Sequence, residues 1–505
     1  MLRSLTIGIL GSLLASAGAA GDVNSAAGRI TRGGPFTEKP PTARTQKPLL
    51  APSWENVALA VPRKRAGCGS QGSAIVVTDG FYPQLQPIVW RGSLKCASSN
   101  APQCSMTGVQ YGTANWPTVS IAGFSDDIAG SSDKQITRLA DGTLLLLHQG
   151  IRRDAGTTAD CTTPEGTCRG AEYFFHSTDC GANWRLVSVL DPATSGPAND
   201  PDRYFNRRTQ AGHDRPELYA DPFNPGRVYM TVLGIGETFG GVVLYRSDDR
   251  GVTWRHIAEL SQIWTGAYMT SLPNGRLFIA GWFGAGPPHQ FTIRSYDPDT
   301  EAISEPRSVG ADLARTPGTR MAAGSEGISR IGSLPDGDYL RTHNTYRTDT
   351  GDYGLVVRVI RVSGSTTNVV REDRYVPPSG TSVVGPSVIE TDRLEWVPGE
   401  ADDPAFIYWY ETRTAGNNRD FGPARVVGQR FDGTVPGIIY CLSLDGTSCR
   451  TWPIFNDVYG DYHRGAFWYD RKKRQLGFLA LWAEQDAVGN GSVRTNVLAL
   501  VRRGS

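Results

Sequence analysis

The chain has 505 residues, with 51 Lys and Arg against 50 Asp and Glu, and a formal net charge of +1. A protein that binds nucleic acid or an anionic membrane over its whole surface usually carries a stronger imbalance, so neither class is favoured. The 59 glycines and the aromatic content of 10% are typical of many short strands joined by tight turns. Length alone would allow several domains, but all-β repeat folds often run long as one unit.

Residues 1–20 have the pattern of a secretory signal peptide. Arg3 precedes an apolar run from Leu5 to Leu14, and small residues from Ala17 to Ala20 form a cleavage site. The apolar run is too short to cross a bilayer. We therefore expect an exported protein, secreted or periplasmic, with no membrane span.

The eight cysteines agree with an oxidising compartment. Three pairs lie close in the sequence, Cys96/Cys104, Cys161/Cys168 and Cys441/Cys449, which leaves Cys68 and Cys180. This pairing is one of the 105 that eight cysteines allow. A metal cluster is not favoured, because no Cys-x-x-Cys and no neighbouring His pair is present.

Residues 21–65 are rich in Gly, Pro, Thr and basic residues, and we expect a flexible leader there. Residues 66–505 then form a single domain. From Ile75 onward, short apolar runs alternate with turn residues, and amphipathic helical periodicity is nearly absent. Three segments, 136–147, 270–279 and 332–340, each predict a strand, an Asp-Gly or Asn-Gly turn and a second strand. The sequence predicts an all-β fold.

Two octapeptides repeat one pattern, Ser-x-Asp-x-Gly-x-(Thr/Asn)-Trp, each after a strand-like apolar run. An Asp side chain can accept hydrogen bonds from the following backbone N–H groups, and Gly supplies a residue with positive φ. The Trp then returns to the sheet as a large apolar side chain. We expect a purely structural role for these residues, which are Ser177, Asp179, Gly181, Trp184, Ser247, Asp249, Gly251 and Trp254.

This octapeptide is the Asp-box, and through it the chain resembles the sialidase (neuraminidase) superfamily and other Asp-box (BNR repeat) β-propellers. The resemblance implies a single β-propeller. The two Trp residues lie about 70 positions apart, and if that spacing is one blade, the domain holds roughly six blades. A third, distorted copy of the box is Ser443–Trp452.

A sialidase site, as the resemblance implies, needs three kinds of group. An arginine cluster holds the substrate carboxylate, because the guanidinium fork matches it in a bidentate manner. A Tyr paired with a carboxylate is the nucleophile, and an Asp is the general acid and base. Such a site requires no metal and no organic cofactor, and its partner is a carbohydrate rather than nucleic acid. We expect a monomer.

The first match to that pattern follows the apolar run that ends at Leu147. Arg152 or Arg153 would bind the carboxylate, and Asp154 (or Asp160) would be the acid and base. The alternative is a charged loop at a strand end with a surface Arg–Asp pair, which stabilises little.

The second match lies on either side of an Asp-Gly turn. Glu326 would be the base that activates the Tyr, and Arg347 a second carboxylate ligand, with Arg341 competing for that role. The alternative is a loop between blades with an exposed Glu.

The third match lies near the C-terminus, where Tyr462 would be the nucleophile and Glu484 would support the arginines. A Tyr at a strand entrance is more often a packing residue. His463 could be an ordinary loop histidine.

The chain departs from the family where an Arg-Ile-Pro motif is expected, since this region contains Lys134 without the bidentate fork of Arg. The third family Arg has no clear match, with Arg419 and Arg425 only nearby. His213, Arg215 and Glu217 form an alternative site. Residues 297–301 offer oxygen atoms for calcium but lack the full loop pattern.

Three functions follow from these patterns. The first is a secreted exo-glycosidase that resembles sialidases and releases a terminal acidic sugar. The second is a non-catalytic propeller that binds glycan or protein at a cell surface. The third is a polysaccharide lyase or another carbohydrate-active enzyme on the same scaffold, using His213 or His463 with Tyr462.

Overall fold

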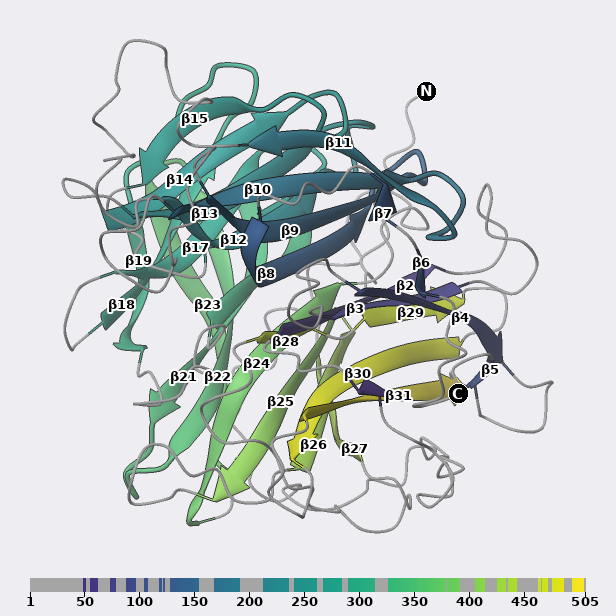
Figure 1. Ribbon diagram of the computed structural model, residues 1–505. Helices are drawn as coiled ribbons and strands as arrows, with labels where there is room; N and C mark the ends of the chain where they lie inside the picture. The colour runs from purple at the N-terminus through teal and green to yellow at the C-terminus, as the bar shows by residue number, and fades with distance from the viewer. Residues whose placement is uncertain are drawn as a thin grey trace, which may run out of the picture.

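The computed structural model of the chain describes its strands and the turns between many of them. The described residues are 49–50, 55–61, 73–78, 88–96, 104–107, 118–119, 121–122, 128–153, 168–190, 212–235, 240–260, 267–283, 289–313, 326–377, 379–390, 405–413, 425–432, 435–442, 462–464, 466–470, 475–485 and 493–503. All the regular elements among them are β-strands (Figure 1). The predicted all-β class is confirmed for this part of the chain.

The first half of the chain contributes four sheets. One contains β2 (Glu55–Val61), β3 (Ser73–Thr78), β4 (Ile88–Cys96), β5 (Cys104–Thr107) and β6 (Thr118–Val119). The next contains β7 (Ile121–Ala122), β8 (Ile128–Arg138), β9 (Leu144–Arg153), β10 (Cys168–Ser177) and β11 (Trp184–Leu190). Two four-stranded sheets follow: β12 (Gly212–Ala220), β13 (Val228–Ile235), β14 (Gly240–Ser247) and β15 (Arg255–Leu260), then β16 (Tyr268–Ser271), β17 (Leu277–Phe283), β18 (His289–Tyr296) and β19 (Arg307–Leu313).

The second half contributes three more sheets. Two are β20 (Glu326–Leu334), β21 (Gly337–Arg347), β22 (Tyr353–Ser363) and β23 (Thr366–Tyr375), then β24 (Thr381–Glu390), β25 (Ala405–Arg413), β26 (Arg425–Asp432) and β27 (Val435–Leu442). The last contains β29 (Ala466–Asp470), β30 (Gln475–Gln485) and β31 (Val493–Arg503), with β1 (Leu49–Leu50) at its edge. β28 (Tyr462–Arg464) joins the sheet of β2. The described residues therefore form seven sheets, and the expected six blades are not confirmed.

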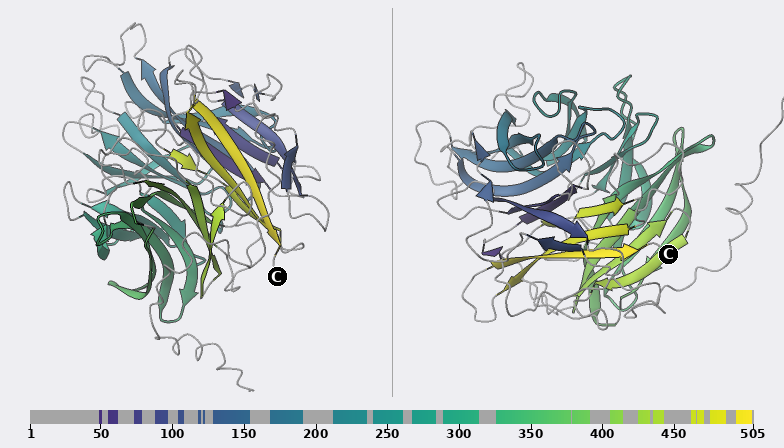
Figure 2. Two further views of the ribbon diagram at one scale, coloured as in Figure 1. Left: turned by 90° about the horizontal axis from the view of Figure 1, so that it is seen from below. Right: turned by 90° about the vertical axis from the view of Figure 1, so that its right-hand side faces the viewer.

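In each sheet, one strand contacts its counterpart in the next sheet. We call β2, β8, β12, β16, β20, β24 and β29 the lead strands. Contacts run from β2 to β8, β12, β16, β20, β24, β29 and back to β2, which makes a complete circuit. The views of Figure 2 show the sheets fanned around the molecule. The lead strands therefore lie together, and the later strands of each sheet lie progressively further out.

Strands from the two ends of the chain pair with each other. Leu49 and Leu50 of β1 pair with Thr495 and Arg494 of β31, and β2 runs parallel to β28. In Figure 1 the purple N-terminal strands lie beside the yellow C-terminal ones. β2 lies within residues 21–65, for which the sequence predicted a flexible leader. Its alternation of Val57, Leu59 and Val61 with smaller or polar residues is that of a half-buried strand.

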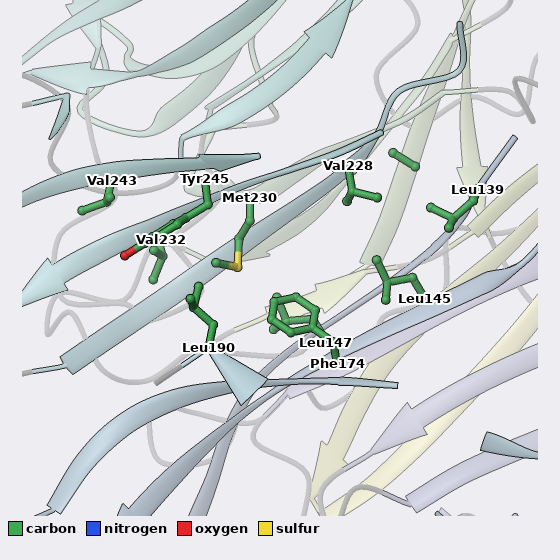
Figure 3. Packing of buried hydrophobic residues seen from close by; sticks show 11 residues of the cluster. Leu139, Leu145, Leu147, Phe174, Leu190, Val228, Met230, Val232, Val243 and Tyr245 are labelled. Carbon is green, nitrogen blue, oxygen red and sulfur yellow. The ribbon is translucent and has the colours of Figure 1, made fainter. Parts of the chain in front are cut away.

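Apolar side chains fill the space between neighbouring sheets. Between the sheets of β9 and β13, the cluster includes Leu145, Leu147, Phe174, Met230 and Tyr245 (Figure 3). Three similar clusters fill the interfaces on either side. Burying one such large side chain contributes about 1.5–3 kcal/mol, more than a typical hydrogen bond at about 1 kcal/mol. Packing between sheets is therefore the main stabilising term.

The two octapeptides form the hairpin turns β10–β11 and β14–β15, which we call the Asp-turns. In the second, Asp249 accepts hydrogen bonds from the Thr253 N–H at 2.8 Å and the Thr253 hydroxyl at 2.6 Å. The Trp254 indole N–H donates to the Gly251 carbonyl at 3.1 Å. The first turn has the same bonds, made by Asp179 with Asn183 and by Trp184 with Gly181. The sequence pattern therefore specifies one recurrent turn, as its chemistry predicted.

The three predicted hairpins also form, but only two share a geometry. In β8–β9, the Leu139 N–H donates to the Thr143 carbonyl, and in β16–β17 Leu272 does the same to Arg276. The third, β20–β21, pairs Leu334 directly with Gly337, which leaves a two-residue loop.

Several sequence predictions fall outside the described residues. These are the signal peptide at 1–20, the third box at Ser443–Trp452, and most of the leader. Cys96 and Cys104 lie directly opposite each other on β4 and β5, a placement that suits the predicted pairing. In the part of the chain that is described, no helix has the length and hydropathy of a membrane span.

Candidate active site

Each sheet has two distinct ends, which are defined by the course of its strands. At the entry end the lead strand begins and the second strand finishes. At the turn end the lead strand passes into the second strand, and in the sheets of β8 and β12 the Asp-turns lie there too. Loops that join strands carry most binding and catalytic residues on folds of this kind.

The described residues predicted for catalysis or substrate binding lie at entry ends, except Arg341, which lies in the middle of β21. Arg152 and Arg153 are the last two residues of β9, and Glu326 is the first residue of β20. Arg347 ends β21, and Glu484 is the penultimate residue of β30. Tyr462 begins β28 and pairs with Glu55, the first residue of β2. Asp154 follows Arg153 directly and lies outside the described residues, as does Asp160.

The two arginines proposed for one role on β21 differ in access to solvent. Arg347 is exposed, whereas Arg341 has only 2% of its surface accessible. Arg347 lies opposite Tyr353 of β22. Burial raises the pKa of Tyr353, and the positive charge of Arg347 opposes that rise. Of the two arginines, Arg347 is therefore the one whose guanidinium can reach a ligand at the entry end.

A buried polar network crosses the sheet beneath Glu326. Arg358 on β22 donates to Glu372 of β23 at 2.7 Å and to the amide oxygen of Asn344 on β21 at 2.6 Å. Arg358 is 2% exposed and Asn344 fully buried. Asn344 is the direct cross-strand partner of Glu326. Hydrogen bonds across β21, β22 and β23 thus hold Asn344 in place opposite Glu326, the predicted base.

The sequence analysis did not single out Arg358, Asn344 or Glu372. A signal was present, because Arg358 interrupts the apolar run Leu355–Val362. Arg361 interrupts the same run but is partly exposed, whereas a buried Arg needs a carboxylate or amide partner. The partners lie 14 residues away in each direction, so their identity depends on strand register.

His343 lies on the same strand and depends on a glycine opposite. It pairs with Gly327 of β20, and a Cβ at that glycine would overlap the His343 ring. His343 is 1% exposed. Gly327, the residue directly after Glu326, is therefore required for close packing rather than for a turn.

The sheet of β8 buries a second set of polar side chains. Lys134 of β8 lies opposite His148 of β9, and both are almost fully buried. Burial, together with the positive charge of Lys134, holds the pKa of His148 well below its ordinary value, so His148 is neutral at physiological pH. Gln149 donates to Glu172 of β10 at 3.2 Å. Lys134, which lies in the region where the sequence resemblance led us to expect an Arg, is therefore buried between its neighbours.

The alternative site residues lie on one lead strand. His213, Arg215 and Glu217 all belong to β12, where the pairing with β13 shifts between Asp214 and Glu217. Glu217 is 7% exposed, and Arg215 is half-buried. Arg215 and Glu217 therefore lie at the same break in the regular pairing of β12 with β13.

The oxygen-rich segment 297–301 forms a turn instead of converging on one point. Asp297 accepts hydrogen bonds from the N–H groups of Asp299 and Thr300, at 2.9 Å and 3.3 Å. These bonds hold the pKa of Asp297 below its ordinary value. Glu301 pairs with Arg255 at 2.5 Å. Within the described residues, no group of three His, Cys, Asp or Glu side chains is arranged to hold a metal ion.

Comparison with known proteins gives no family. No protein-family model matches the chain, and no curated protein matches it. Similar solved structures include an α-L-arabinofuranosidase of Fusarium graminearum, with a TM-score of 0.39 and 15% identity over 74% of this chain and 93% of that chain. The NanB sialidase of Streptococcus pneumoniae has a TM-score of 0.41 and 11% identity, over 86% and 84% of the two chains. A polysaccharide lyase described as an ulvan lyase has a TM-score of 0.36 and 12% identity, over 91% and 96%. Likeness at this level does not assign an activity.

Proposed function

We propose that this protein is an exported glycosidase that releases a terminal acidic sugar from glycans, on a propeller whose blades are the seven sheets. One observation carries the proposal. The predicted carboxylate ligands, base, nucleophile and supporting Glu come from distant parts of the sequence and from four sheets, yet Arg152, Arg153, Arg347, Glu326, Tyr462 and Glu484 all lie at entry ends. The Asp-turns lie at the opposite end. A random scatter of residues would populate both ends.

In this mechanism the arginines hold the sugar carboxylate, and Glu484 supports them. Glu326 takes the phenolic proton of Tyr462 as its oxygen attacks the anomeric carbon. Asp154 gives a proton to the leaving oxygen as the glycosidic bond breaks. Water then attacks the glycosyl–tyrosine bond, Asp154 takes its proton, and the tyrosine regains its proton from Glu326. Arg152, Arg153 and Arg347 supply the guanidinium groups.

The test is hydrolysis of a fluorogenic α-sialoside by the purified protein, beside Tyr462→Phe. The matched control is Tyr339→Phe, because the Tyr339 hydroxyl donates to Asp336 at the turn end of its sheet. We expect turnover that disappears in Tyr462→Phe and persists in Tyr339→Phe. Turnover that survives in Tyr462→Phe would remove that residue from its role while keeping the activity.

A second candidate, a polysaccharide lyase, is favoured by one observation. Lys134 stands where the family carries an Arg, and it is buried opposite a neutral His148. A site that lacks this guanidinium would have to bind an acidic sugar through other groups. A lyase abstracts the proton beside the uronate carboxylate and leaves an unsaturated sugar. Ultraviolet absorbance on polyuronate substrates detects that product, with Tyr462→Phe and His463→Ala compared. No turnover on either substrate type would favour the non-catalytic glycan-binding alternative.

A further inference from the structure

Arg215 has a backbone conformation that its position does not explain. Among the described residues, four other than glycine have positive φ: Cys180, Arg215, Arg250 and Glu301. Cys180 and Arg250 precede the glycines of the two Asp-turns, and Glu301 lies in the turn after Asp297. Left-handed residues are ordinary in such turns. Arg215, with φ of 53°, is the one that lies inside a strand.

The residue that follows makes this conformation less favourable still. Pro216 restricts the residue before it to extended conformations, and the left-handed region is sparsely populated by residues with a Cβ. Asn or Gly would adopt this φ more readily than Arg. Backbone strain of this kind persists where the surrounding structure imposes it, most often at ligand-binding and active sites.

The strain lies at a bulge that recurs on other lead strands. From Asp214 to Glu217, β12 moves three residues along the chain while its partner β13 moves only two, so β12 contains one extra residue. The pairing of β8 shifts in the same way between Ser131 and Lys134, and that of β24 between Val384 and Ser387. All three bulges lie between the third and the seventh residue of their lead strands. Bulges redirect side chains and are frequent beside active sites.

Charged side chains gather at two of these bulges. Asp133 and Lys134 lie at that of β8, and Glu217 at that of β12; they are 5%, 2% and 7% exposed. β8 and β12 are neighbouring lead strands in contact. Arg215 is half-buried, so its side chain keeps partial access to solvent while the three others do not.

We propose that Arg215 contacts the bound glycan and recognises an anionic group of the sugar, its carboxylate or a sulfate. A guanidinium offers a planar fork of N–H donors that matches either group. The bulge and the left-handed backbone direct this side chain away from the regular alternation of β12. The inference rests on the proposed acidic-sugar function in its choice of ligand, but it does not require that the sugar be cleaved.

The experiment measures binding and stability separately. Binding of N-acetylneuraminic acid and of glucuronic acid is followed by calorimetry, with galactose as the neutral reference. The variants are Arg215→Gly, Arg215→Asn and Arg215→Lys. The control is Arg250→Gly, which relieves the same left-handed conformation at an Asp-turn and removes only an ion pair with Asp141.

We expect the wild type to bind at least one acid and not galactose. Arg215→Gly and Arg215→Asn should bind at least tenfold more weakly, with a melting temperature equal to or a few degrees above that of the wild type. Arg215→Lys should keep part of the affinity, and Arg250→Gly all of it. Arg215→Asn retains a side chain that accepts this backbone, so one of the two variants remains informative if the other is unstable.

Unchanged affinity in a folded Arg215 variant would overturn the inference, and so would a wild type that binds none of the acids. The outcome is separable from that of the proposed function. Acid binding that depends on Arg215 without hydrolysis supports this inference while the glycosidase proposal fails. Hydrolysis that persists in Arg215→Gly would support the glycosidase proposal and count against this inference.

Discussion

The hydroxyl oxygen of Ser247 accepts the backbone N–H of Gly251 at 2.7 Å, inside the second Asp-turn. The same hydroxyl donates to Asp249 at 2.8 Å, so one side chain links the carboxylate to the backbone of the turn. Ser177 makes both bonds in the first turn, at the same two distances. Each Asp-turn is therefore a closed local network, and its parts can be removed one at a time.

Asp249→Ala should destabilise the protein by about 1–2 kcal/mol. It removes the acceptor of the two bonds from Thr253 and of the one from Ser247, near the surface where water replaces part of the loss. Thr253→Val removes only the hydroxyl bond and should cost about half as much. Urea unfolding measures both. Equal values for the two variants would show that neither the backbone bond from Thr253 nor the bond from Ser247 contributes.

The same carboxylates should make stability depend on pH. Burial opposes the change, but the bonds from Asn183 and Thr253 outweigh it and hold the pKa of Asp179 and of Asp249 below the ordinary value. A lowered folded-state pKa gives stability that is present above the unfolded pKa of about 3.9 and is lost as pH falls through the folded pKa. The difference between wild type and Asp249→Ala should therefore shrink as the pH falls below about 4. A constant difference would contradict a role for the ionised carboxylate.

Gly181→Ala and Gly142→Ala should separate two costs of replacing a turn glycine. Both glycines have positive φ, 80° and 94°, so each Ala would carry about 1–2 kcal/mol of backbone strain. A Cβ at Gly181 would lie 2.6 Å from Ile75 Cδ1, whereas one at Gly142 would meet nothing within 4 Å. We expect Gly181→Ala to cost a further ~1–3 kcal/mol. Thermal unfolding tests this, and equal costs would show that Ile75 moves aside freely.

Arg358→Met should lower both stability and activity. It would leave buried Asn344 and half-exposed Glu372 without their shared donor, a loss of about 1–3 kcal/mol. If Glu326 is the base, the variant should also reduce kcat about tenfold, with less effect on KM, because a shift of Asn344 displaces Glu326 opposite it. The control is Arg374→Ala, which removes the other guanidinium on Glu372, at 2.7 Å on the exposed side. Its kcat should be unchanged, and an equal loss of kcat in both variants would argue for a general folding defect.

Truncation should locate the start of the folded domain at β1 rather than at residue 66. A chain beginning at residue 48 keeps β1 and β2 and should unfold cooperatively near the wild-type temperature. A chain beginning at residue 66 lacks β2, whose pairing with both β3 and β28 would be lost. We expect it to aggregate or to melt without a sharp transition. Wild-type-like unfolding of the shorter chain would restore the boundary read from the sequence.

Local features of the sequence predicted local structure well. The Asp-turns and the paired strands around them follow from residues within eight positions of one another, so no long-range information was needed. The blade count depended on one spacing, from Trp184 to Trp254. It could not anticipate that the N- and C-terminal segments contribute strands to each other's sheets.

The order of the candidate site residues along the chain could be predicted from the sequence, but their contacts could not. Glu326, Arg347 and Tyr462 were found from family-like spacing, and their entry-end positions follow from strand direction. The network of Arg358 and the bulge at Arg215 depend on register, which sequence spacing does not reveal. Pro216 and Pro386 were available signals, because proline inside a strand occurs mainly at edges or bulges.

The pairing of β1 with β31 and of β2 with β28 also sets an order of events in biosynthesis. These contacts join segments more than 400 residues apart, and closing so long a loop is entropically costly and slow. The middle sheets can assemble as the chain emerges, but the circuit stays open until β28 to β31 have left the ribosome. The nascent protein should therefore remain sensitive to proteases, and dependent on chaperones, until its last forty or so residues arrive.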